Sequence, residues 1–327
     1  MRQVLVSVLK FKKMSEKILI TGGAGFIGSH FAIRAARENF EIVVLDVLNY
    51  AADLQNLAAV SDLPNFKFIR GDICDPQIAE LFSAEKFDFV VNFAAETHVD
   101  FSISDPAKFA RTNFLGTENL LRIARDFSIK KFVQVSTDEV YGSLDSTGKK
   151  FTENSPLRPN SPYAASKAGA DLLARSFFKT FDFPVCVSRC SNNFGPHQDL
   201  SKLIPTIISR ARRDEKIPIY GDGKNIRDWL FVDDHVDGIF KILQNFTPGE
   251  IYNFGGNCEK NNLEIARAVL RILNKSESLI EFVADRPGHD FRYAVDFSRA
   301  EKNLNWRPSF DFSKNLQKTV DFFAKKL

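Results

Sequence analysis

The sequence predicts an α/β fold, with a doubly wound parallel sheet and a second, smaller α/β lobe. A strand, a glycine-rich turn, a helix and a second strand follow one another over residues 17–46. Apolar runs and helical patterns then alternate to about residue 187, and turn-rich pieces replace this alternation beyond residue 188. Strands that alternate with helices are typical of a parallel sheet, because each crossover between parallel strands needs a covering helix.

The unit over residues 17–46 has the parts of a Rossmann-type dinucleotide site. An apolar run over residues 18–21 leads into a glycine turn, a helical pattern covers residues 29–38, and a second apolar run ends on Asp46. The free N–H groups and the positive dipole end of such a helix hold the pyrophosphate of a dinucleotide. An acid in the position of Asp46 accepts hydrogen bonds from ribose hydroxyls and repels a 2′-phosphate, which favours NAD over NADP.

Three glycines of the turn have separate expected roles. We expect Gly22 to supply the tight turn, Gly25 to let the backbone approach the pyrophosphate, and Gly28 to let the helix lie close to the sheet. A purely structural turn is the alternative, and the strand, helix and acid at the expected spacing argue against it.

Three further apolar runs, over residues 66–69, 87–93 and 131–135, are the expected remaining strands of a five-stranded parallel sheet. A helical pattern over residues 112–126 separates the last two. Their nearly unbroken apolar character suits strands that helices cover on both faces.

Acidic and small residues follow two of these runs. Asp72 follows the first run, where it would accept a hydrogen bond from an adenine amino group or cap a helix expected over residues 76–82, and both interpretations stay open. Ala94 and Ala95 follow the second run and leave room for a ligand at the carboxyl end of the strand, which is where open α/β sheets bind their ligands.

Two domains are expected. The dinucleotide-binding domain would cover residues 17–187 and about 228–251, and the smaller, substrate-binding domain about residues 188–227 and 252–327. Residues 1–16 are expected to lie outside the fold as an extension, and they lack the small-residue cleavage site of a signal peptide.

Composition and charge exclude several classes of protein. Apolar residues make up 44% and charged residues 26% of the 327 residues, as in ordinary globular proteins. The formal net charge is only +3, with scattered basic residues, so we expect no nucleic-acid surface, and no apolar run reaches membrane-spanning length. The four cysteines form neither a close pair nor a cluster with histidine, so we expect no metal site and a location in the reducing cytoplasm.

Tyr163 and Lys167 form the first candidate catalytic pair. They stand four residues apart at the start of a helical run, so both side chains lie on one helix face. A lysine ammonium about 4 Å away, helped by the positive charge of an oxidised nicotinamide, would lower the pKa of the phenol from about 10 toward neutrality. Tyr163 would then act as a general base, whereas the alternative is a surface tyrosine and lysine.

Thr137, Asp138 and Glu139 form the second candidate group, just past the expected carboxyl end of the fifth strand. A hydroxyl followed by two carboxylic side chains offers a hydrogen-bond donor, an acid and a base within a short distance. Crowding raises the pKa of one carboxyl, so that one group stays protonated while the other ionises. A solvated turn with a helix-capping acid is the alternative.

Together these residues resemble the extended short-chain dehydrogenase/reductase superfamily, and within it the dTDP-glucose 4,6-dehydratase family. The resemblance runs from about residue 17 to near residue 310. It rests on the segments at residues 21–28, 70–73, 94–100, 136–142, 163–167, 189–196, 226–235, 285–290 and 292–293.

The resemblance implies an internal redox elimination, with dTDP-glucose as the expected substrate. Tyr163 would take the proton of the sugar C4 hydroxyl while hydride passes from C4 to NAD, and Thr137 would hydrogen-bond the same oxygen. Glu139 would remove the C5 proton, Asp138 would protonate the C6 hydroxyl that leaves as water, and hydride would return to C6. The 4-keto-6-deoxy product would feed the synthesis of deoxysugars such as dTDP-rhamnose.

The resemblance also implies two sets of binding residues. For NAD they are Gly22, Gly25, Phe26, Ile27, Gly28, Asp46, Asn49, Asp72, Ile73, Ala94, Ala95, Thr112, Tyr163, Lys167 and Asn193. For the sugar nucleotide they are Thr97, Thr137, Asn192, Lys202, Leu203, Tyr220, Arg227, Asn262, Arg286 and His289. The cations of the second set suit a diphosphate.

Several alternatives stay open. Ser201 stands where the family carries an acidic residue near the base, so dehydration of UDP- or CDP-glucose is an alternative. A sugar-nucleotide 4-epimerase or decarboxylase of the same superfamily would need the tyrosine and lysine without the two carboxyl groups, and a non-catalytic NAD-binding scaffold would need neither. Helices over residues 112–126 and 163–179 are expected to pair in a homodimer.

Overall fold

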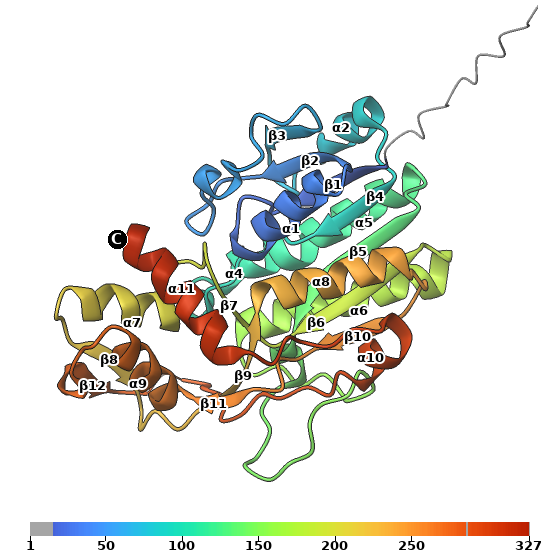
Figure 1. Cartoon of the computed structure of the whole chain (residues 1–327). Helices are drawn as coiled ribbons and strands as arrows, with labels where there is room; N and C mark the ends of the chain where they lie inside the picture. Colours follow the sequence, from blue (N-terminus) through green and yellow to red (C-terminus); the bar gives the residue numbers. More distant parts are fainter. Residues whose placement is uncertain (1–15, 286, 327) are drawn as a thin grey trace, which may run out of the picture.

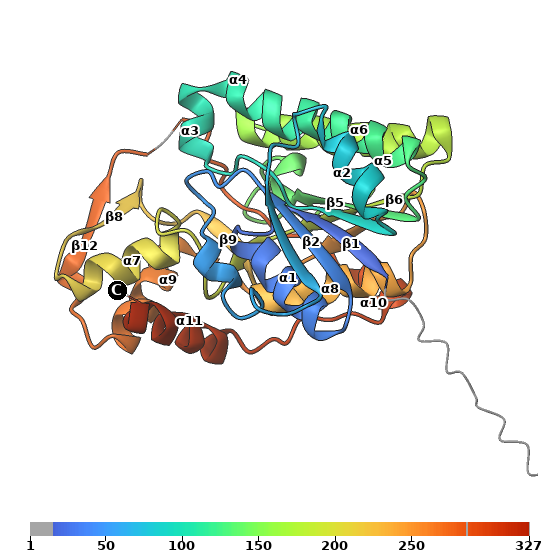
Figure 2. The ribbon, with the colours of Figure 1, turned by 90° about the horizontal axis from the view of Figure 1, so that it is seen from above.

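The computed structural model describes residues 16–285 and 287–326. The extension predicted over residues 1–16 lies outside this part of the chain except for its last residue, Glu16. The described residues form a parallel sheet with helices on both faces, and a smaller lobe beside it (Figures 1 and 2). None of the described helices is both long enough and apolar enough to cross a membrane.

The central sheet has seven parallel strands in the order β3-β2-β1-β4-β5-β6-β10. They are β1 (Lys17–Thr21), β2 (Glu41–Asp46), β3 (Phe66–Arg70), β4 (Phe89–Asn92), β5 (Lys131–Thr137), β6 (Val185–Cys190) and β10 (Ile251–Phe254). The chain moves outward in one direction from β1 to β3 and then returns to β4, so the strand order reverses between β1 and β4. A ligand crevice is expected at the carboxyl ends of the strands beside such a reversal.

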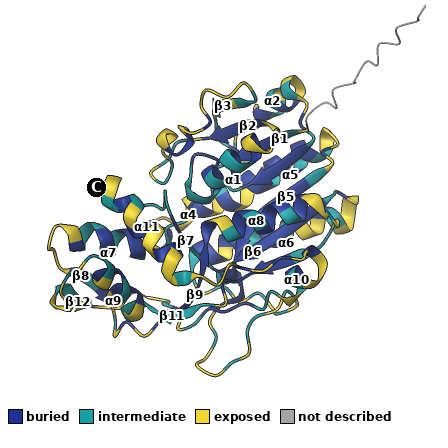
Figure 3. Ribbon diagram, viewed as in Figure 1, coloured by how far each residue is buried: buried dark blue, intermediate teal, exposed yellow. Residues whose placement is uncertain are grey.

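Helices cover both faces because the strands are apolar on both sides. All residues of β4 and β6 are buried, and Figure 3 shows the central strands buried under helices whose outer faces are exposed, whereas the edge strand β3 is only partly covered. One face carries α1 (Phe26–Arg37), α8 (Val232–Gln244) and α10 (Ser298–Leu304). The other face carries α2 (Ile78–Glu85), α5 (Gly116–Asp126) and α6 (Pro162–Phe181).

The smaller lobe has its own apolar core. It contains a three-stranded sheet, β11-β9-β7, and the pair β12-β8. Its elements are β7 (Asn192–Phe194), α7 (Leu203–Arg212), β8 (Ile217–Tyr220), β9 (Ile226–Phe231), β11 (Glu259–Asn261), α9 (Asn262–Ile272), β12 (Ile280–Val283) and α11 (Phe312–Lys326). The predicted domain boundaries stay a prediction. The helix α10, which follows β12 in the chain, packs against the helix α8 and against the strand β10 of the large sheet.

Several element boundaries differ from the sequence prediction; for example, α1 begins at Phe26 where the pattern predicted residue 29. The helix predicted from residue 112 begins earlier, as a π-helical turn at Ala110–Leu115 that leads into α5. The helix predicted over residues 76–82 is α2, which begins two residues later. β5 continues to Thr137, so Ser136 and Thr137 end the strand, and the 3-10 turn Asp138–Tyr141 follows. Short segments also form at η1 (Leu54–Leu57), α3 (Val99–Ser104), α4 (Pro106–Phe109) and η4 (Glu277–Leu279).

The glycine turn after β1 is closely packed at two of its three glycines. Gly22 has a φ of 66°, and an added Cβ would lie 2.6 Å from the backbone nitrogen of Ala94 at the end of β4. An added Cβ on Gly28 would lie 2.3 Å from the carbonyl oxygen of Gly22. Gly28 therefore brings α1 close to the turn itself, whereas the sequence predicted closeness to the sheet. At Gly25 the nearest atom would be 3.3 Å away.

We predict that Gly28→Ala destabilises the protein more than Gly25→Ala does. The methyl group of the first variant overlaps backbone that cannot move independently, which should lower the free energy of unfolding by about 2 kcal/mol. The methyl group of the second variant would lie 3.3 Å from the same carbonyl oxygen of Gly22, a much smaller overlap that a shift of a few tenths of an ångström relieves. Urea denaturation of both variants measures the difference, and equal losses would contradict the packing described for Gly28.

Candidate active site

A cavity of about 440 Å³ lies at the carboxyl ends of the central strands, where the strand order reverses. Every predicted NAD-binding and catalytic residue lines it. Four predicted sugar-nucleotide residues, Thr97, Thr137, Asn192 and Lys202, line it as well. The predicted residues that line the cavity are Gly22, Gly25, Phe26, Ile27, Gly28, Asp46, Asn49, Asp72, Ile73, Ala94, Ala95, Thr97, Thr112, Thr137, Asp138, Glu139, Tyr163, Lys167, Asn192, Asn193 and Lys202.

Asp46 is fixed at the end of β2 by two backbone donors. Its carboxylate accepts hydrogen bonds from the N–H of Ala24, at 3.0 Å, and of Leu48, at 2.8 Å. Burial raises the pKa of Asp46, and the two N–H groups oppose that rise because they favour the charged form. The side chain is 6% exposed and lines the cavity, which is the placement that a ribose-binding acid needs.

The first turn of α1 suits a pyrophosphate. The helix begins after Gly25, which has no side chain to cap the first N–H groups. The free side of Gly25 and these N–H groups border the cavity, so an anion can approach the backbone there.

Asp72 does not cap α2, whose N-cap residue is Gln77. The Asp72 carboxylate instead accepts a hydrogen bond from the N–H of Cys74 at 2.9 Å and lies 3.8 Å from the guanidinium of Arg111. Both charged side chains line the cavity. Of the two interpretations left open by the sequence, the helix cap is wrong and contact with a ligand stays a prediction.

Buried polar atoms without a hydrogen-bond partner gather around the cavity. Among the described residues, those atoms that belong to its lining are Glu96 Oε2, Ser136 Oγ, Asp138 Oδ2, Ser191 Oγ, Asn192 Oδ1 and Gln198 Oε1. A buried polar atom without a partner is costly, so a cluster of them is typical of a site where a polar ligand supplies the missing hydrogen bonds. Together with the glycine turn and Asp46, they fit a dinucleotide and a second polar ligand.

Tyr163 and Lys167 lie on the first turns of α6, and both are buried in the wall of the cavity. The helix starts here because the Ser161 hydroxyl accepts a hydrogen bond from the N–H of Ala164 at 3.1 Å and Pro162 occupies the first helical position. The Lys167 ammonium donates to the carbonyl oxygen of Val135 in β5 at 2.6 Å.

In the protein alone, the pKa of Tyr163 is raised. Burial and the nearby Glu139 raise the pKa of Tyr163 well above its usual value, and a hydrogen bond with Thr137 opposes the rise only in part. Burial also lowers the pKa of Lys167 from 10.5 to about 8. The prediction that Lys167 and an oxidised nicotinamide together bring the phenol toward neutrality concerns the site with its cofactor bound, and it stays a prediction. In the protein alone the ammonium is held on Val135, and burial favours the neutral forms of both groups.

Asp138 is the buried acid of the second group. The Thr137 hydroxyl lies 3.3 Å from Asp138 Oδ1 as a donor, and it accepts from the N–H of Glu139 at 3.3 Å. Asp138 is 1% exposed. Burial, then Glu139 and Asp228, raise the pKa of Asp138 well above its usual value. The predicted separation of the two carboxyl groups is confirmed on the Asp138 side, and the alternative of a solvated turn is wrong.

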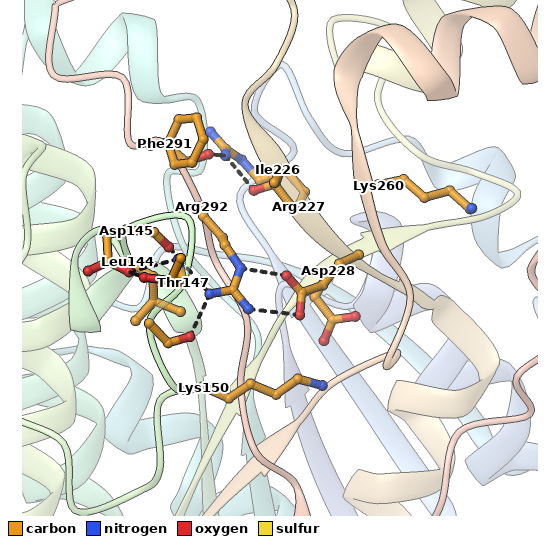
Figure 4. Close-up of polar contacts among 12 residues, drawn as sticks. Leu144, Asp145, Thr147, Lys150, Ile226, Arg227, Asp228, Lys260, Phe291 and Arg292 are labelled. Atoms are coloured by element: carbon orange, nitrogen blue, oxygen red, sulfur yellow. Dashed lines mark hydrogen bonds and ion pairs between the residues drawn. The ribbon is translucent and has the colours of Figure 1, made fainter.

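Five further predicted sugar-nucleotide residues do not line the cavity: Leu203, Tyr220, Arg227, Asn262 and His289. Leu203 starts α7, Asn262 starts α9, and the rings of Tyr220 and His289 are 6.3 Å apart. Arg227 is buried on β9, where its guanidinium donates to the carbonyl oxygens of Ile226, at 2.8 Å, and Phe291, at 3.4 Å (Figure 4). Arg286 lies outside the described residues.

Arg292 holds the loop after the catalytic turn. Its guanidinium donates two hydrogen bonds to the carboxylate of Glu259 in β11, at 2.6 and 3.1 Å, and one to the carbonyl oxygen of Gly148 at 2.7 Å. Asp228, fully buried on β9, accepts the N–H of Cys258 at 2.8 Å, and burial raises its pKa to about 6. Asp228 thus adds negative charge near Asp138.

Several cavity residues had no assigned role in the sequence analysis. Glu96 is the clearest: one of its oxygens lies 3.0 Å from the ammonium of Lys108 and accepts the amide of Asn49 at 3.1 Å. Its position between Ala95 and Thr97, both predicted site residues, was a usable signal. Further lining residues with polar or thiol side chains are Lys108, Arg111, Ser136, Cys190, Ser191, Gln198 and Asp199.

Comparisons with known proteins agree with this site. The family model described as GDP-mannose 4,6 dehydratase matches residues 19–319. The chain is 44% identical to the dTDP-glucose 4,6-dehydratase of Xanthomonas campestris pv. campestris (strain B100), over 93% of this chain and 92% of that protein.

Two solved structures of enzymes with different activities are similar to this chain. The dTDP-glucose 4,6-dehydratase DesIV from Streptomyces venezuelae, with NAD and TYD bound, is 44% identical with a TM-score of 0.90, and the match covers 94% of this chain and 97% of that chain. A UDP-glucose 4-epimerase from Thermotoga maritima, with UDP-glucose, has a similar TM-score of 0.89 at only 27% identity, over 95% and 99% of the two chains. The backbone is therefore shared with epimerases, whereas the sequence is more similar to the dehydratases.

We predict that Lys167→Met removes a pH dependence of stability. The folded protein holds the Lys167 proton less firmly than the unfolded chain does, so the stability of the wild type rises as the pH rises from about 8 to 10.5. Between pH 7 and pH 10, the free energy of unfolding of the wild type should rise by about 2 to 3 kcal/mol relative to that of Lys167→Met. Urea denaturation at both pH values measures this gain. If the difference in unfolding free energy between the two proteins were the same at both pH values, the pKa of Lys167 would not be lowered by burial.

Proposed function

Because the chain belongs to the dTDP-glucose 4,6-dehydratase family, we propose that it is an NAD-dependent hydro-lyase that converts dTDP-glucose to dTDP-4-keto-6-deoxyglucose and water. One observation supports this reaction above all others. Asp138, a buried acid with a raised pKa, lies beside Glu139 in the same cavity as Tyr163 and Lys167. A simple oxidation does not need an acid and a base beside the tyrosine, whereas loss of water needs both.

The glycine turn, the first turn of α1 and Asp46 would hold the NAD pyrophosphate and ribose. When bound, NAD supplies a reversible hydride acceptor, which takes hydride from C4 of the sugar and returns it to C6. Because hydride leaves and returns within one turnover, tight retention of the cofactor suits this reaction.

Tyr163 would remove the proton of the C4 hydroxyl, and the Thr137 hydroxyl would hydrogen-bond the same oxygen. The raised pKa of Tyr163 means that the protein alone holds the neutral phenol. The ammonium of Lys167 and the positive charge of the oxidised nicotinamide would together favour the phenolate, so Tyr163 should become a base only in the loaded site.

Elimination would follow oxidation at C4. A ketone at C4 acidifies the hydrogen on C5, and Glu139 would remove it. Asp138 would donate its proton to the C6 hydroxyl, which leaves as water. The burial that raises the pKa of Asp138 is what keeps this proton available near neutral pH.

Lys202 and Thr97 would hold the sugar nucleotide at the cavity, because the Lys202 ammonium already contacts the Thr97 carbonyl oxygen at 2.9 Å. Leu203, Tyr220, Arg227, Asn262, Arg286 and His289 are the proposed outer contacts. The dTDP nucleotide is proposed from the similar dehydratases, although Ser201 replaces the acidic residue expected near the base.

A 4-epimerase or decarboxylase is disfavoured by the Asp138 and Glu139 pair and by the lower identity to the epimerase. A non-catalytic NAD-binding scaffold is disfavoured because it would have no use for a buried acid.

We further propose a homodimer formed through the predicted helix pair, which corresponds to the π-helical turn Ala110–Leu115 with α5 and to α6. Apolar side chains are exposed there: Leu115 is 55% and Leu172 is 52% exposed. Two copies that pack these faces together would bury both side chains.

The direct test of the reaction is incubation with dTDP-glucose, UDP-glucose and CDP-glucose in deuterated water. We expect the alkaline absorbance of a 4-keto product and deuterium at C5, with one nucleotide preferred. Inversion at C4 of a UDP-sugar without loss of water would contradict the proposal and favour an epimerase.

Glu139→Gln should lower kcat by at least about 100-fold, since a positioned general base contributes about 10²- to 10⁴-fold. The variant should still oxidise C4, so the cofactor should remain reduced after mixing with substrate, which absorbance records. Unimpaired turnover would remove Glu139 from the mechanism.

Leu172→Glu should convert the proposed dimer to monomer, because a charge would be buried at the contact. Analytical ultracentrifugation measures the change. Phe282→Glu is the control, since Phe282 is 56% exposed on β12 in the smaller lobe and should leave the dimer intact. A dimer in both variants would place the interface elsewhere.

A further inference from the structure

A buried polar cluster of Arg189, Asp171 and Tyr141 lies behind the catalytic turn. None of the three side chains lines the cavity, and the proposed reaction assigns none of them a role. They come from the three elements that surround the catalytic groups: Arg189 from β6, Asp171 from α6 and Tyr141 from the turn Asp138–Tyr141.

Arg189 makes a two-bond ion pair with Asp171. Its Nε lies 2.7 Å from one carboxylate oxygen and its Nη2 lies 2.8 Å from the other. Asp171 is fully buried and Arg189 is almost so. Asp171 stands four residues after Lys167, one turn further along α6, so the pair connects β6 to the helix that carries Tyr163 and Lys167.

The same guanidinium holds Tyr141. Nη1 of Arg189 donates to the Tyr141 hydroxyl at 2.7 Å, and the guanidinium lies 4.9 Å from the centre of the ring. The hydroxyl in turn donates to the side-chain oxygen of Asn253 in β10 at 2.8 Å. Both hydrogen-bonding functions of the hydroxyl are therefore used, and the buried Tyr141 cannot shift without breaking them.

Tyr141 connects the buried cluster to the proposed acid, Asp138, and the proposed base, Glu139. It is the last residue of a four-residue 3-10 turn whose first two residues are Asp138 and Glu139. The other end of the turn is held by β5, since Ser136 and Thr137 pair with Arg189 and Cys190 of β6. The turn is thus fixed at both ends by the segment of β6 that contains Arg189.

Stability alone does not account for the cluster. A buried ion pair is often no more stabilising than well-packed apolar side chains of similar size, because both charges lose their hydration. What an apolar replacement cannot supply is the directional bond to the Tyr141 hydroxyl.

We propose that Arg189 is a positioning residue for the loss of water: anchored on Asp171, it holds Tyr141 and so sets the position of Asp138 and Glu139 relative to Tyr163. This inference rests on the proposed function. Tyr163 and Lys167 have further supports in the Ser161 cap and the Val135 carbonyl group. The charge of Asp171 also raises the pKa of Lys167, so Tyr141→Phe, which leaves Asp171 in place, is the variant that isolates the turn. Loosening the turn therefore affects the elimination step more than the oxidation step.

The test compares four proteins: the wild type, Tyr141→Phe, the double variant Arg189→Met with Asp171→Leu, and the control Arg34→Met. Tyr141→Phe removes only the hydroxyl, and the double variant replaces the ion pair by apolar side chains. Arg34 is a matched control, because it contacts Glu38 at 2.8 Å and Asp237 at 3.0 Å and lies 4.4 Å from the Phe240 ring, between α1 and α8. None of these four residues lines the cavity.

Rapid mixing with dTDP-glucose measures oxidation from the absorbance of the reduced cofactor, and the 4-keto product measures elimination. Urea denaturation gives the stability of each protein. We expect Tyr141→Phe and the double variant to lose about tenfold or more in product formation, as for loss of a hydrogen bond to a charged group, while the oxidation rate changes less than about threefold. Reduced cofactor should accumulate in both, and KM should stay near the wild-type value. Arg34→Met should lose stability only.

Equal losses in oxidation and elimination, or unchanged elimination in the two cluster variants, would overturn the positioning role. If the double variant fails to fold, Tyr141→Phe alone decides between these results. A wild type that forms no 4-keto product from any of the three nucleotide sugars would overturn the proposed function, and the positioning role with it. The two failures are therefore distinguished by the wild-type measurement.

Discussion

The burial of the Asp138 carboxyl group is the constraint on which the rest of the site depends. An aspartate exposed to water would be ionised near neutral pH and could not donate a proton. At the end of β5, Asp138 loses its hydration, and Glu139 and Asp228 add negative charge nearby. Its Oδ2 has no hydrogen-bond partner among the described residues. A proton on this oxygen would therefore be available to a ligand in the cavity. Burial of Asp138 and Asp228 lowers the free energy of unfolding, because both carboxyl groups lose their hydration.

The parallel sheet makes such burial possible. β4, β5 and β6 are covered on both faces, and their carboxyl ends meet at the cavity, so residues far apart in the chain come together around one cavity. Asp46, Glu96, Asp138 and Lys167 come from four different segments of the chain, yet all line the same space. Polar atoms without partners remain at this edge, which is consistent with a protein whose site is completed by its ligands. The fold itself is shared with epimerases, so the acid and base on the turn after β5 carry the argument for dehydration.

Local patterns in the sequence predicted the elements and most of the site. The glycine turn, the acid at the end of β2 and the Tyr163 and Lys167 pair depend on spacing over a few residues, and spacing is visible in a sequence. The direction of the Tyr163 pKa was not visible, because it depends on desolvation by neighbours from β5 and on the contact between Lys167 and Val135. The cluster of Arg189, Asp171 and Tyr141 was missed for a similar reason: its partners are 18 and 48 residues away from the arginine. The π-helical turn at Ala110–Leu115 also has no local signal that pattern reasoning could use.

The protonation state of Asp138 is the measurement that tests this account most directly. Infrared difference spectra between the wild type and Asp138→Asn, recorded over a pH titration, follow the carboxyl group of Asp138 alone, because Asp228 is present in both proteins. The account predicts that the band of the protonated Asp138 carboxyl group persists to a higher pH than the band of an exposed aspartate does. A band that disappears at the pH of an exposed aspartate would contradict it, because the proposed acid would then have no proton to give.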